Sequence, residues 1–480
     1  MYRASTSRLG LLASAATMVV LGVAMPAATA RPLVPTHAAS ASDVQLVKAS
    51  KYAKTSKKKA RRIAEARRKA RAERRAARLA RIRAAGSPAA QTATAETAPK
   101  TILTRAEILA SDPAVLERIG RHVMIGYHRV SDVEALLERR AIAGVFITDH
   151  NVRRRKAEDI RAEIDRFQAI RANQGLPPLV IAADQEGGAV SRLSPPLKSQ
   201  PALGRVLRRA KDETTLKAAV EDYALLQARE LKRLGVTLNF SPVVDLRLDP
   251  RRRTDGETLL RFRAISPDPI LVARIAGWYC AALATEDLSC TLKHFPGLGR
   301  VKVDTHRRPG SIDAAASELL SRDWRPFTEL MHRPTVATML AHVTLPAIDP
   351  DHAASYSKPV IDGLIRRDMA LKGVLITDDL SMGAVRRSTD GLWRAPAKSL
   401  NAGADLLLVS YSERDLDTVM SGLIEAAKAG EIDGAVREAS RTRLDRFIGA
   451  PQPRALSAPS VSAPANSPRA DLPTSGPTPH

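Results

Sequence analysis

The feature that most constrains the fold is a regular alternation of short apolar runs with longer helical patterns. Eight such runs occur, at residues 123–127, 144–147, 179–183, 236–240, 290–295, 336–341, 373–377 and 405–409. Runs that are apolar almost throughout are typical of strands buried on both faces, and the helices between them indicate parallel pairing. The sequence therefore predicts an α/β fold, a (β/α)8 TIM-type barrel, with an open doubly wound sheet as the alternative. No G-x-G-x-x-G motif follows the first run, which argues against dinucleotide binding.

Polar side chains gather where these predicted strands end. Five successive runs are followed by or end in polar residues. These are Asp184, Gln185 and Glu186 after the third run, Asn239 to Asp245 around the end of the fourth, Lys293 and His294 at the end of the fifth, His342 after the sixth, and Asp378 and Asp379 after the seventh. Because the βα loops form one face of a barrel, we expect these side chains to share a site. Carboxylates, Lys and His at one rim can hydrogen-bond hydroxyls in many directions, which favours a polyhydroxylated, uncharged ligand.

Two other kinds of site fit the sequence less well. His294, His306 and His342 could supply metal ligands, but no close pair of ligand residues at helical spacing accompanies them. The chain also lacks the G-x-S-x-G elbow of a serine hydrolase. We therefore expect neither a metal nor a cofactor. Cys280 and Cys290 are too few for a disulfide framework, so we interpret them as core residues, with a single bridge as the alternative.

The two ends of the chain differ in composition from the central part, residues 101–450. Arg3 and Arg8 precede an apolar run and a small-residue pattern ending at Ala30, which indicates a signal peptide over residues 1–30. We thus expect export to the periplasm or beyond, with an uncleaved membrane anchor as the alternative. Residues 31–100 are interpreted as a basic arm and linker, and residues 451–480, rich in Pro and Ser, as a disordered tail.

Most of the positive charge lies in the basic arm. Residues 48–83 hold 17 Lys or Arg against Glu65 and Glu73, a net of +15 within a total of +24 for the chain. This segment lacks an apolar face that could pack on a core, so we expect it to be solvated. Its charge favours an anionic envelope polymer or membrane surface as a partner, and export makes nucleic acid the least expected one.

Six motifs occur in order between residues 103 and 448: ADQEGGAVSRL, LGVTLNFSPVVDL, KHFPGLGRVKVDTH, AHVTLPAIDP, GVLITDDLSMGAV and LNAGADLLLV. Together they resemble the β-N-acetylhexosaminidases of glycoside hydrolase family 3, the type that works on peptidoglycan fragments. The resemblance implies that Asp378 is the catalytic nucleophile and that His306 is the acid/base, with Asp304 as its partner. It also implies that the terminal N-acetylglucosamine is held by Asp184, Arg192, Arg263, Lys293 and His294. The Asp-Thr-His loop separates this branch from the β-glucosidases of the family.

The stretch from Lys293 to His306 combines two tasks. Lys293 and His294 end a strand and can bind sugar hydroxyls, while the glycines that follow let the loop turn and bring Asp304 and His306 over the scissile bond. An imidazole with a reference pKa of about 6.5 can give and take protons near neutrality. Asp304 would orient that imidazole and stabilise its protonated form.

Two positions depart from the family pattern. Leu298 stands where the family usually has a second His, and Ala189 stands where it usually has Arg. Neither position carries a role assigned above. These departures bear on the resting position of the loop and on the outer subsites, rather than on the residues assigned to the reaction.

The leading hypothesis is an exported, retaining exo-β-N-acetylglucosaminidase that acts on muropeptides through a covalent glycosyl-enzyme. Asp378, at the end of a buried strand near the cations of Lys293 and Arg263, is expected to stay ionised and attack the anomeric carbon. The enzymatic alternatives are a chitooligosaccharide hexosaminidase and an N-acetylglucosaminide phosphorylase of the same family. A non-catalytic envelope-binding protein would lack the nucleophile or the acid/base, and this chain has both.

Overall fold

The computed structural model describes residues 101–248, 256–410 and 412–449. The predicted signal peptide (1–30), basic arm and linker (31–100) and tail (451–480) lie outside these residues. In the described ranges, no helix has the length and apolar character needed to cross a bilayer.

The centre of the fold is a sheet of eight parallel strands whose order around the sheet follows the chain. The strands are β1 (Val123–Gly126), β2 (Gly144–Ile147), β3 (Val180–Ala183), β6 (Leu238–Asn239), β7 (Ser289–Phe295), β9 (Val336–Leu340), β12 (Leu375–Thr377) and β13 (Leu407–Val409). β13 pairs with β1, and a parallel bridge between Ile376 and Leu406 joins it to β12 at the other end of the order. The sheet therefore closes, which confirms the predicted barrel and excludes the open doubly wound alternative.

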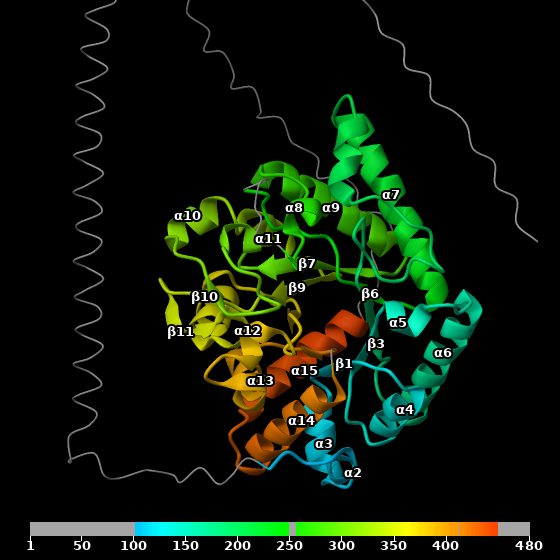
Figure 1. Ribbon diagram of the computed structural model, residues 1–480, viewed down its shortest axis with the longest axis vertical. Helices are drawn as coiled ribbons and strands as arrows, with labels where there is room; N and C mark the ends of the chain where they lie inside the picture. Colours follow the sequence, from blue (N-terminus) through cyan, green and yellow to red (C-terminus); the bar gives the residue numbers. More distant parts are fainter. Residues whose placement is uncertain (1–100, 249–255, 411, 450–480) are drawn as a thin grey trace, which may run out of the picture. The chain divides into compact units, whose positions relative to one another are not determined.

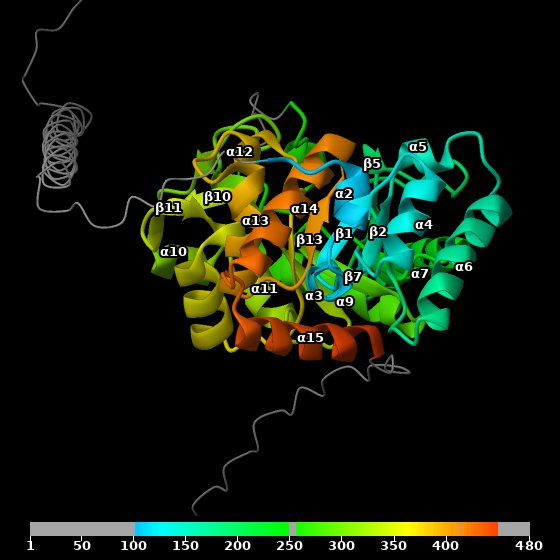
Figure 2. The ribbon, with the colours of Figure 1, turned by 90° about the horizontal axis from the view of Figure 1, so that it is seen from below.

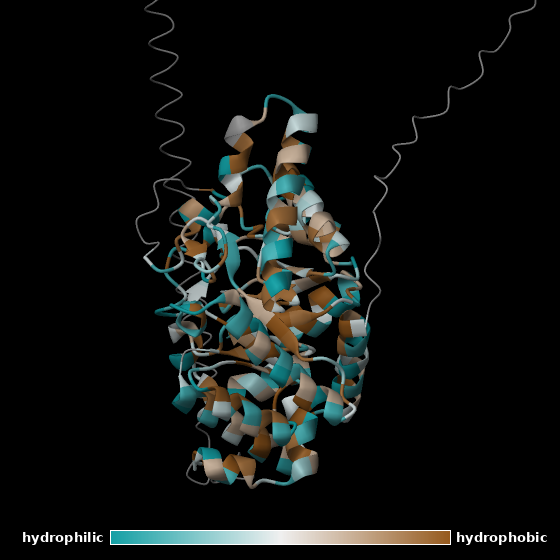
Figure 3. Ribbon diagram, turned by 90° about the vertical axis from the view of Figure 1, so that its right-hand side faces the viewer, coloured by the Kyte–Doolittle hydropathy of each residue, from teal (hydrophilic) through white to brown (hydrophobic). Residues whose placement is uncertain are grey.

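The strands are apolar throughout because both of their faces are buried. In β1, Val123 and Ile125 pack against the surrounding helices, whereas Met124 belongs to a second cluster inside the barrel. In β2, Val145 faces the helices and Phe146 faces the interior. Figure 3 shows hydrophobic strand segments in the middle of the domain. This double burial explains why the sequence shows continuous apolar runs and no alternation with polar residues.

Helices cover the outside of the barrel (Figures 1 and 2). The α-helices are α2 (Arg105–Leu109), α3 (Pro113–Gly120), α4 (Val130–Glu138), α5 (Asp149–Val152), α6 (Ala157–Asn173), α7 (Glu213–Leu234), α8 (Leu260–Arg263), α9 (Pro269–Thr285), α10 (Ala316–Ser321), α11 (Arg325–Leu330), α12 (Gly383–Arg386), α13 (Gly391–Ala402), α14 (Glu413–Lys428) and α15 (Gly434–Gly449). Short 3-10 turns are η2 (Leu203–Arg209), η3 (Leu298–Arg300) and η4 (Ala354–Tyr356), and η5 (Pro359–Asp368) is a π-helix. The sequence sets several ends: α7 starts after the capping side chain of Asp212 and stops at Gly235, whose φ is 88°.

Helix α15 closes the end of the barrel where the strands begin. Its Leu444 and Phe447 belong to the same cluster as the residues that fill the barrel interior. The buried carboxylate of Asp405, just before β13, accepts hydrogen bonds from Arg443 Nε (2.8 Å) and Ser440 Oγ (2.7 Å) of this helix. The opposite end, where the strands stop, is thereby left for the site.

Two smaller sheets lie in the loops and were not predicted from the sequence. One is a hairpin of β4 (Gln185–Gly187) and β5 (Val190–Ser191), directly after β3. The other joins β8 (Gly310–Ser311), β10 (Val343–Leu345) and β11 (Asp349–Ala353). Each strand is too short to leave a clear periodic pattern in the sequence.

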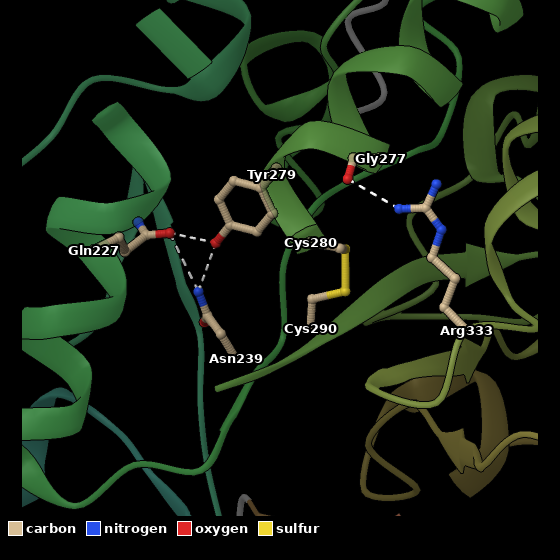
Figure 4. Close-up of a disulfide and its surroundings, with 7 residues drawn as sticks. All are labelled: Gln227, Asn239, Gly277, Tyr279, Cys280, Cys290 and Arg333. Atoms are coloured by element: carbon tan, nitrogen blue, oxygen red, sulfur yellow. Dashed lines mark hydrogen bonds between the residues drawn. A yellow bond between two sulfur atoms is a disulfide. The ribbon is translucent and has the colours of Figure 1, made fainter. Parts of the chain in front are cut away.

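Cys280 and Cys290 are buried, as expected, but the interpretation of them as separate core residues is wrong, because they form a disulfide (Figure 4). The bridge ties α9 to the start of β7, the strand that ends in Lys293 and His294. The two residues come from elements that pack side by side. Their separation of ten residues in the sequence did not by itself establish that packing.

Candidate active site

A pocket with about 660 Å³ of empty space opens where the barrel strands end. Seven of the eight residues predicted from the sequence line it, namely Asp184, Arg192, Arg263, Lys293, His294, His306 and Asp378. The eighth, Asp304, contacts His306 beside the pocket. The structure therefore brings together side chains that are spread over 195 positions of the chain, from 184 to 378.

His306 and Asp304 form a hydrogen-bonded pair at the pocket. His306 Nδ1 lies 3.0 Å from Asp304 Oδ1, and the His306 backbone N–H donates to the same oxygen at 3.1 Å. Glu257 N–H and Thr258 Oγ1 donate to Asp304 as well, at 2.6 and 3.0 Å. Burial pushes the pKa of Asp304 upward, but the hydrogen bonds outweigh it and hold the pKa at about 2. The carboxylate is thus ionised at neutral pH and oriented toward the imidazole.

The loop that carries His306 is fastened to the start of α12. Gly383 N–H donates to the carbonyl oxygen of His306 at 2.7 Å, and Ala384 N–H donates to that of Thr305 at 3.1 Å. A Cβ at position 383 would lie 2.3 Å from the carbonyl oxygen of Arg307, so this close approach requires glycine. The motif that contains Asp378 therefore also holds the loop of His306 in place.

Asp378 directly follows β12 and lines the pocket. Its carboxylate accepts the N–H of Asp379 at 2.8 Å. Burial pushes the pKa of Asp378 upward, but three neighbouring imidazoles, with that hydrogen bond, hold it below its ordinary value. These imidazoles belong, in order of effect, to His294, His342 and His306. An ionised carboxylate at a strand end is suited to act as a nucleophile.

The expected source of that stabilisation needs correction. The sequence suggested that Lys293 and Arg263 would be the cations beside Asp378. Instead, both pair with Glu186, and the imidazoles are the leading groups acting on Asp378. A buried ammonium and guanidinium require carboxylate partners of their own, and Glu186 supplies them.

Asp379 is adjacent in sequence but has a different environment. Its carboxylate accepts hydrogen bonds from the Ser410 hydroxyl and from Ser381 N–H, the latter at 2.8 Å. Burial, together with the charge of Asp378, raises the pKa of Asp379 to about 6. The carbonyl oxygen of Asp379 lies 2.9 Å from His342 Nε2. This side chain and His342 support the loop around Asp378.

Glu186 is the centre of a buried charge cluster. Arg263 binds it with two nitrogens, Nε to Oε2 at 2.8 Å and Nη2 to Oε1 at 2.6 Å, and Lys293 Nζ lies 2.5 Å from Oε1. Lys293 Nζ also contacts Asp184 Oδ1 at 2.6 Å. Burial pushes the pKa of Glu186 upward, but the two cations outweigh it and bring the pKa to about 2. The side chain of Asp184, 23% exposed, is the member of this cluster most open to a ligand.

His294 is oriented by a carboxylate that the sequence did not single out. Asp245 Oδ2 lies 2.7 Å from His294 Nδ1, and Asp245 Oδ1 accepts the backbone N–H groups of His294 (3.1 Å) and Leu298 (2.7 Å). His294 Nε2, on the other side of the ring, lies 3.5 Å from Arg263 Nη2. Arg192 lies exposed at the rim of the pocket.

The two departures from the family pattern have different surroundings. Leu298 is buried and gives the pocket an apolar wall. Ala189 is exposed between β4 and β5, at the turn of the hairpin. Leu298 is therefore the one that faces the pocket.

Sequence reasoning expected Glu186 and Asp245 at the site, because they stand among the polar residues at strand ends, but it gave them no role. It missed Thr258. Thr258 lies in a long loop after β6, where no pattern marked it. In the part of the chain that the structure describes, no group of three or more His, Cys, Asp or Glu is arranged to hold a metal ion.

Comparison with known proteins adds independent findings. The family profile described as glycosyl hydrolase family 3 N terminal domain matches residues 114–447. A β-hexosaminidase of Stenotrophomonas maltophilia is 34% identical over 336 residues, which cover 65% of this chain and 94% of the relative. The structure of a family 3 β-N-acetylglucosaminidase from Paenibacillus superposes with a TM-score of 0.63 at 27% identity, over 73% of this chain and 66% of that one. The structure of Mycobacterium tuberculosis LpqI superposes with a TM-score of 0.61 at 26% identity, over 73% and 98% of the two chains.

Proposed function

The chain belongs to glycosyl hydrolase family 3 and is a glycoside hydrolase, and we propose that it is a retaining exo-β-N-acetylglucosaminidase that removes non-reducing N-acetylglucosamine from peptidoglycan fragments. One observation carries the proposal. A buried, ionised carboxylate, Asp378, and an imidazole–carboxylate pair, His306 and Asp304, meet at one pocket that polar side chains line. The matched relatives are named β-hexosaminidase and β-N-acetylglucosaminidase.

The proposed reaction has two steps. In the first, Asp378 attacks the anomeric carbon while His306 Nε2 gives its proton to the departing glycosidic oxygen, so that a covalent glycosyl-enzyme forms and the aglycone leaves. In the second, His306 takes a proton from water, which attacks the anomeric carbon and releases Asp378. Two displacements at one carbon retain its configuration. Asp304, ionised throughout, stabilises the imidazolium in both directions.

Binding of the terminal sugar is proposed for the polar wall of the pocket. Asp184 and His294 can bind hydroxyls, and Arg192 lies at the rim. Lys293 and Arg263 are held by Glu186, so their positions are fixed before a ligand arrives. A preorganised site loses little entropy when the sugar binds.

Export is part of the proposal. The predicted signal peptide supports it, and so does the disulfide, since such bridges persist mainly in oxidising compartments. The basic arm would then hold the enzyme near an anionic envelope or membrane surface. Full-length protein should bind sacculi or anionic vesicles more tightly than a chain of residues 101–450, and added salt should shrink the difference. If deletion of the arm abolished turnover of a small soluble substrate while the barrel stayed folded, the arm would not be a tether.

Product analysis with purified muropeptides tests the function directly. We expect release of free N-acetylglucosamine. A comparison of the rate of release from muropeptides with that from chitooligosaccharides would distinguish these two substrate classes. A requirement for phosphate, with formation of the sugar 1-phosphate, would point to the phosphorylase alternative. Intact muropeptides after incubation with folded enzyme would overturn the proposal.

A further inference from the structure

We propose that Thr258 positions the His306–Asp304 pair for proton transfer, an inference that rests on the acid/base role proposed for His306. Thr258 is 5% exposed and borders the pocket, in the segment that leads from β6 into α8. It is 46 residues from Asp304 in sequence.

Thr258 and its neighbour hold both oxygens of the Asp304 carboxylate. The Thr258 hydroxyl donates to Oδ1 at 3.0 Å, and this is the oxygen that faces His306 Nδ1, also at 3.0 Å. The N–H groups of Glu257 and Thr258 point to Oδ2, at 2.6 and 3.4 Å. The terminal torsion of an Asp side chain is broad, so a carboxylate keeps one orientation only when its partners impose it. The Thr258 hydroxyl is the side-chain partner that fixes Oδ1 toward the imidazole.

The backbone of Thr258 is anchored to the buried charge cluster. Its carbonyl oxygen accepts a hydrogen bond from Arg263 Nη1 at 2.8 Å, and the same guanidinium is bound by Glu186 through two nitrogens. A continuous set of hydrogen bonds therefore runs from the sugar-binding cations to the proposed acid/base.

The neighbouring residue supports a fixed geometry at this point. Leu259 has a φ of 49°, in the left-handed region that residues with a side chain rarely adopt. Such conformations persist where the surrounding structure imposes them, and they concentrate at functional sites. The backbone directly after Thr258 is therefore one that its surroundings impose.

A positioning role and a merely structural role give different kinetics. Loss of stability lowers the activity on every substrate by the same factor, because it reduces the amount of folded enzyme. Misplacement of the acid affects mainly those substrates whose leaving group needs a proton. The experiment therefore compares kcat/KM for an N-acetylglucosaminyl disaccharide with kcat/KM for a dinitrophenyl N-acetylglucosaminide.

Thr258→Val, which keeps the shape and removes the hydroxyl, should lower kcat/KM on the disaccharide by about 10- to 100-fold, the range expected for one hydrogen bond to a charged group. On the dinitrophenyl substrate the loss should be about threefold or less. Thr258→Ser should restore the disaccharide activity. Thr338→Val is the matched control, because Thr338 has a buried hydroxyl without a hydrogen-bond partner among the described residues, and it should leave both values unchanged.

Equal losses on both substrates, no loss, or no rescue by Thr258→Ser would overturn the inference. His306→Ala, measured in parallel, separates this failure from failure of the proposed function. If His306→Ala shows the selective loss and Thr258→Val does not, only the role of Thr258 is wrong. If His306→Ala shows none, the acid/base assignment and the inference fall together. Should Thr258→Val fail to fold, Thr258→Ala removes the same hydroxyl and is evaluated by the same comparison.

Discussion

Nδ1 of His306 lies 3.0 Å from Oδ1 of Asp304, so Nε2 is the ring nitrogen left to exchange a proton with a substrate. Most glycosidases use a second carboxylic acid for this step. Here the hydrogen bonds to Asp304 outweigh the effect of burial and lower the pKa of its carboxyl group to about 2. Asp304 therefore orients the imidazole and does not itself transfer a proton.

His306→Ala should hurt substrates with poor leaving groups far more than activated aryl glycosides. An activated leaving group departs with little protonation, so loss of the acid is partly hidden there. Asp304→Asn should act in the same direction by a smaller amount, since it keeps the imidazole. Steady-state kcat/KM on both substrate classes checks this, and equal losses for His306→Ala would indicate that His306 binds sugar without transferring a proton.

Glu186→Gln should destabilise the folded protein by about 3–5 kcal/mol, the usual result of removing one partner from a buried ion pair. The reason is that Lys293 and Arg263 would remain buried with less compensating charge. Urea unfolding at neutral pH measures the change. Asp165→Asn removes one partner of the exposed Arg161–Asp165 pair and should cost about 1 kcal/mol or less. Similar values for the two variants would contradict the role of Glu186.

Asp379→Asn should change the pH dependence of stability. Burial and the charge of Asp378 raise the pKa of Asp379 to about 6 in the folded state, above its ordinary value of 3.8. A carboxyl group with a raised pKa contributes stability that is full below about pH 4 and is lost as the pH rises through about 6. Asp379→Asn removes this pH-dependent loss. As the pH rises from 4.5 to 7.5, the unfolding free energy of the variant should therefore increase relative to that of the wild type, by at most about 3 kcal/mol. If the variant and the wild type differed in unfolding free energy by the same amount at both pH values, the raised pKa of Asp379 would be ruled out.

The double variant Cys280→Ala and Cys290→Ala should unfold more easily than the wild type, by about 3 kcal/mol for a bridge that closes a loop of this length. Urea unfolding of the two proteins without reductant gives the difference. Thiol titration of the urea-unfolded wild type should find no free thiol before reduction. Two titratable thiols would show that the bridge does not form.

The barrel could be predicted because its strands leave a strong signal. Each of the eight apolar runs overlaps a strand of the closed sheet, since double burial makes the whole strand apolar. The short strands β4 and β5 were missed, since a hairpin of two or three residues per strand has no measurable period. The pairing of Cys280 with Cys290 depended on how α9 packs against β7, which sequence spacing does not determine.

The members of the site were easier to predict than their partners. Asp378 and Lys293 stand at strand ends within recognisable motifs, and the pocket unites them. The charge partner of Lys293 was not predictable, because Glu186 comes close to Lys293 only when the chain turns into β4 after β3. Thr258 reaches Asp304 across 46 residues and leaves no local pattern.

The central claim is that Asp378 attacks the anomeric carbon and forms a covalent glycosyl-enzyme. Incubation with a slowly hydrolysed fluorinated N-acetylglucosamine analogue, followed by mass spectrometry and peptide mapping, tests it most directly. We predict the addition of one sugar mass within residues 373–382, located on Asp378. Asp378→Ala should abolish the label, whereas Asp379→Asn should retain it. A label on Asp379, or release of a sugar with inverted configuration as followed by NMR, would contradict the account.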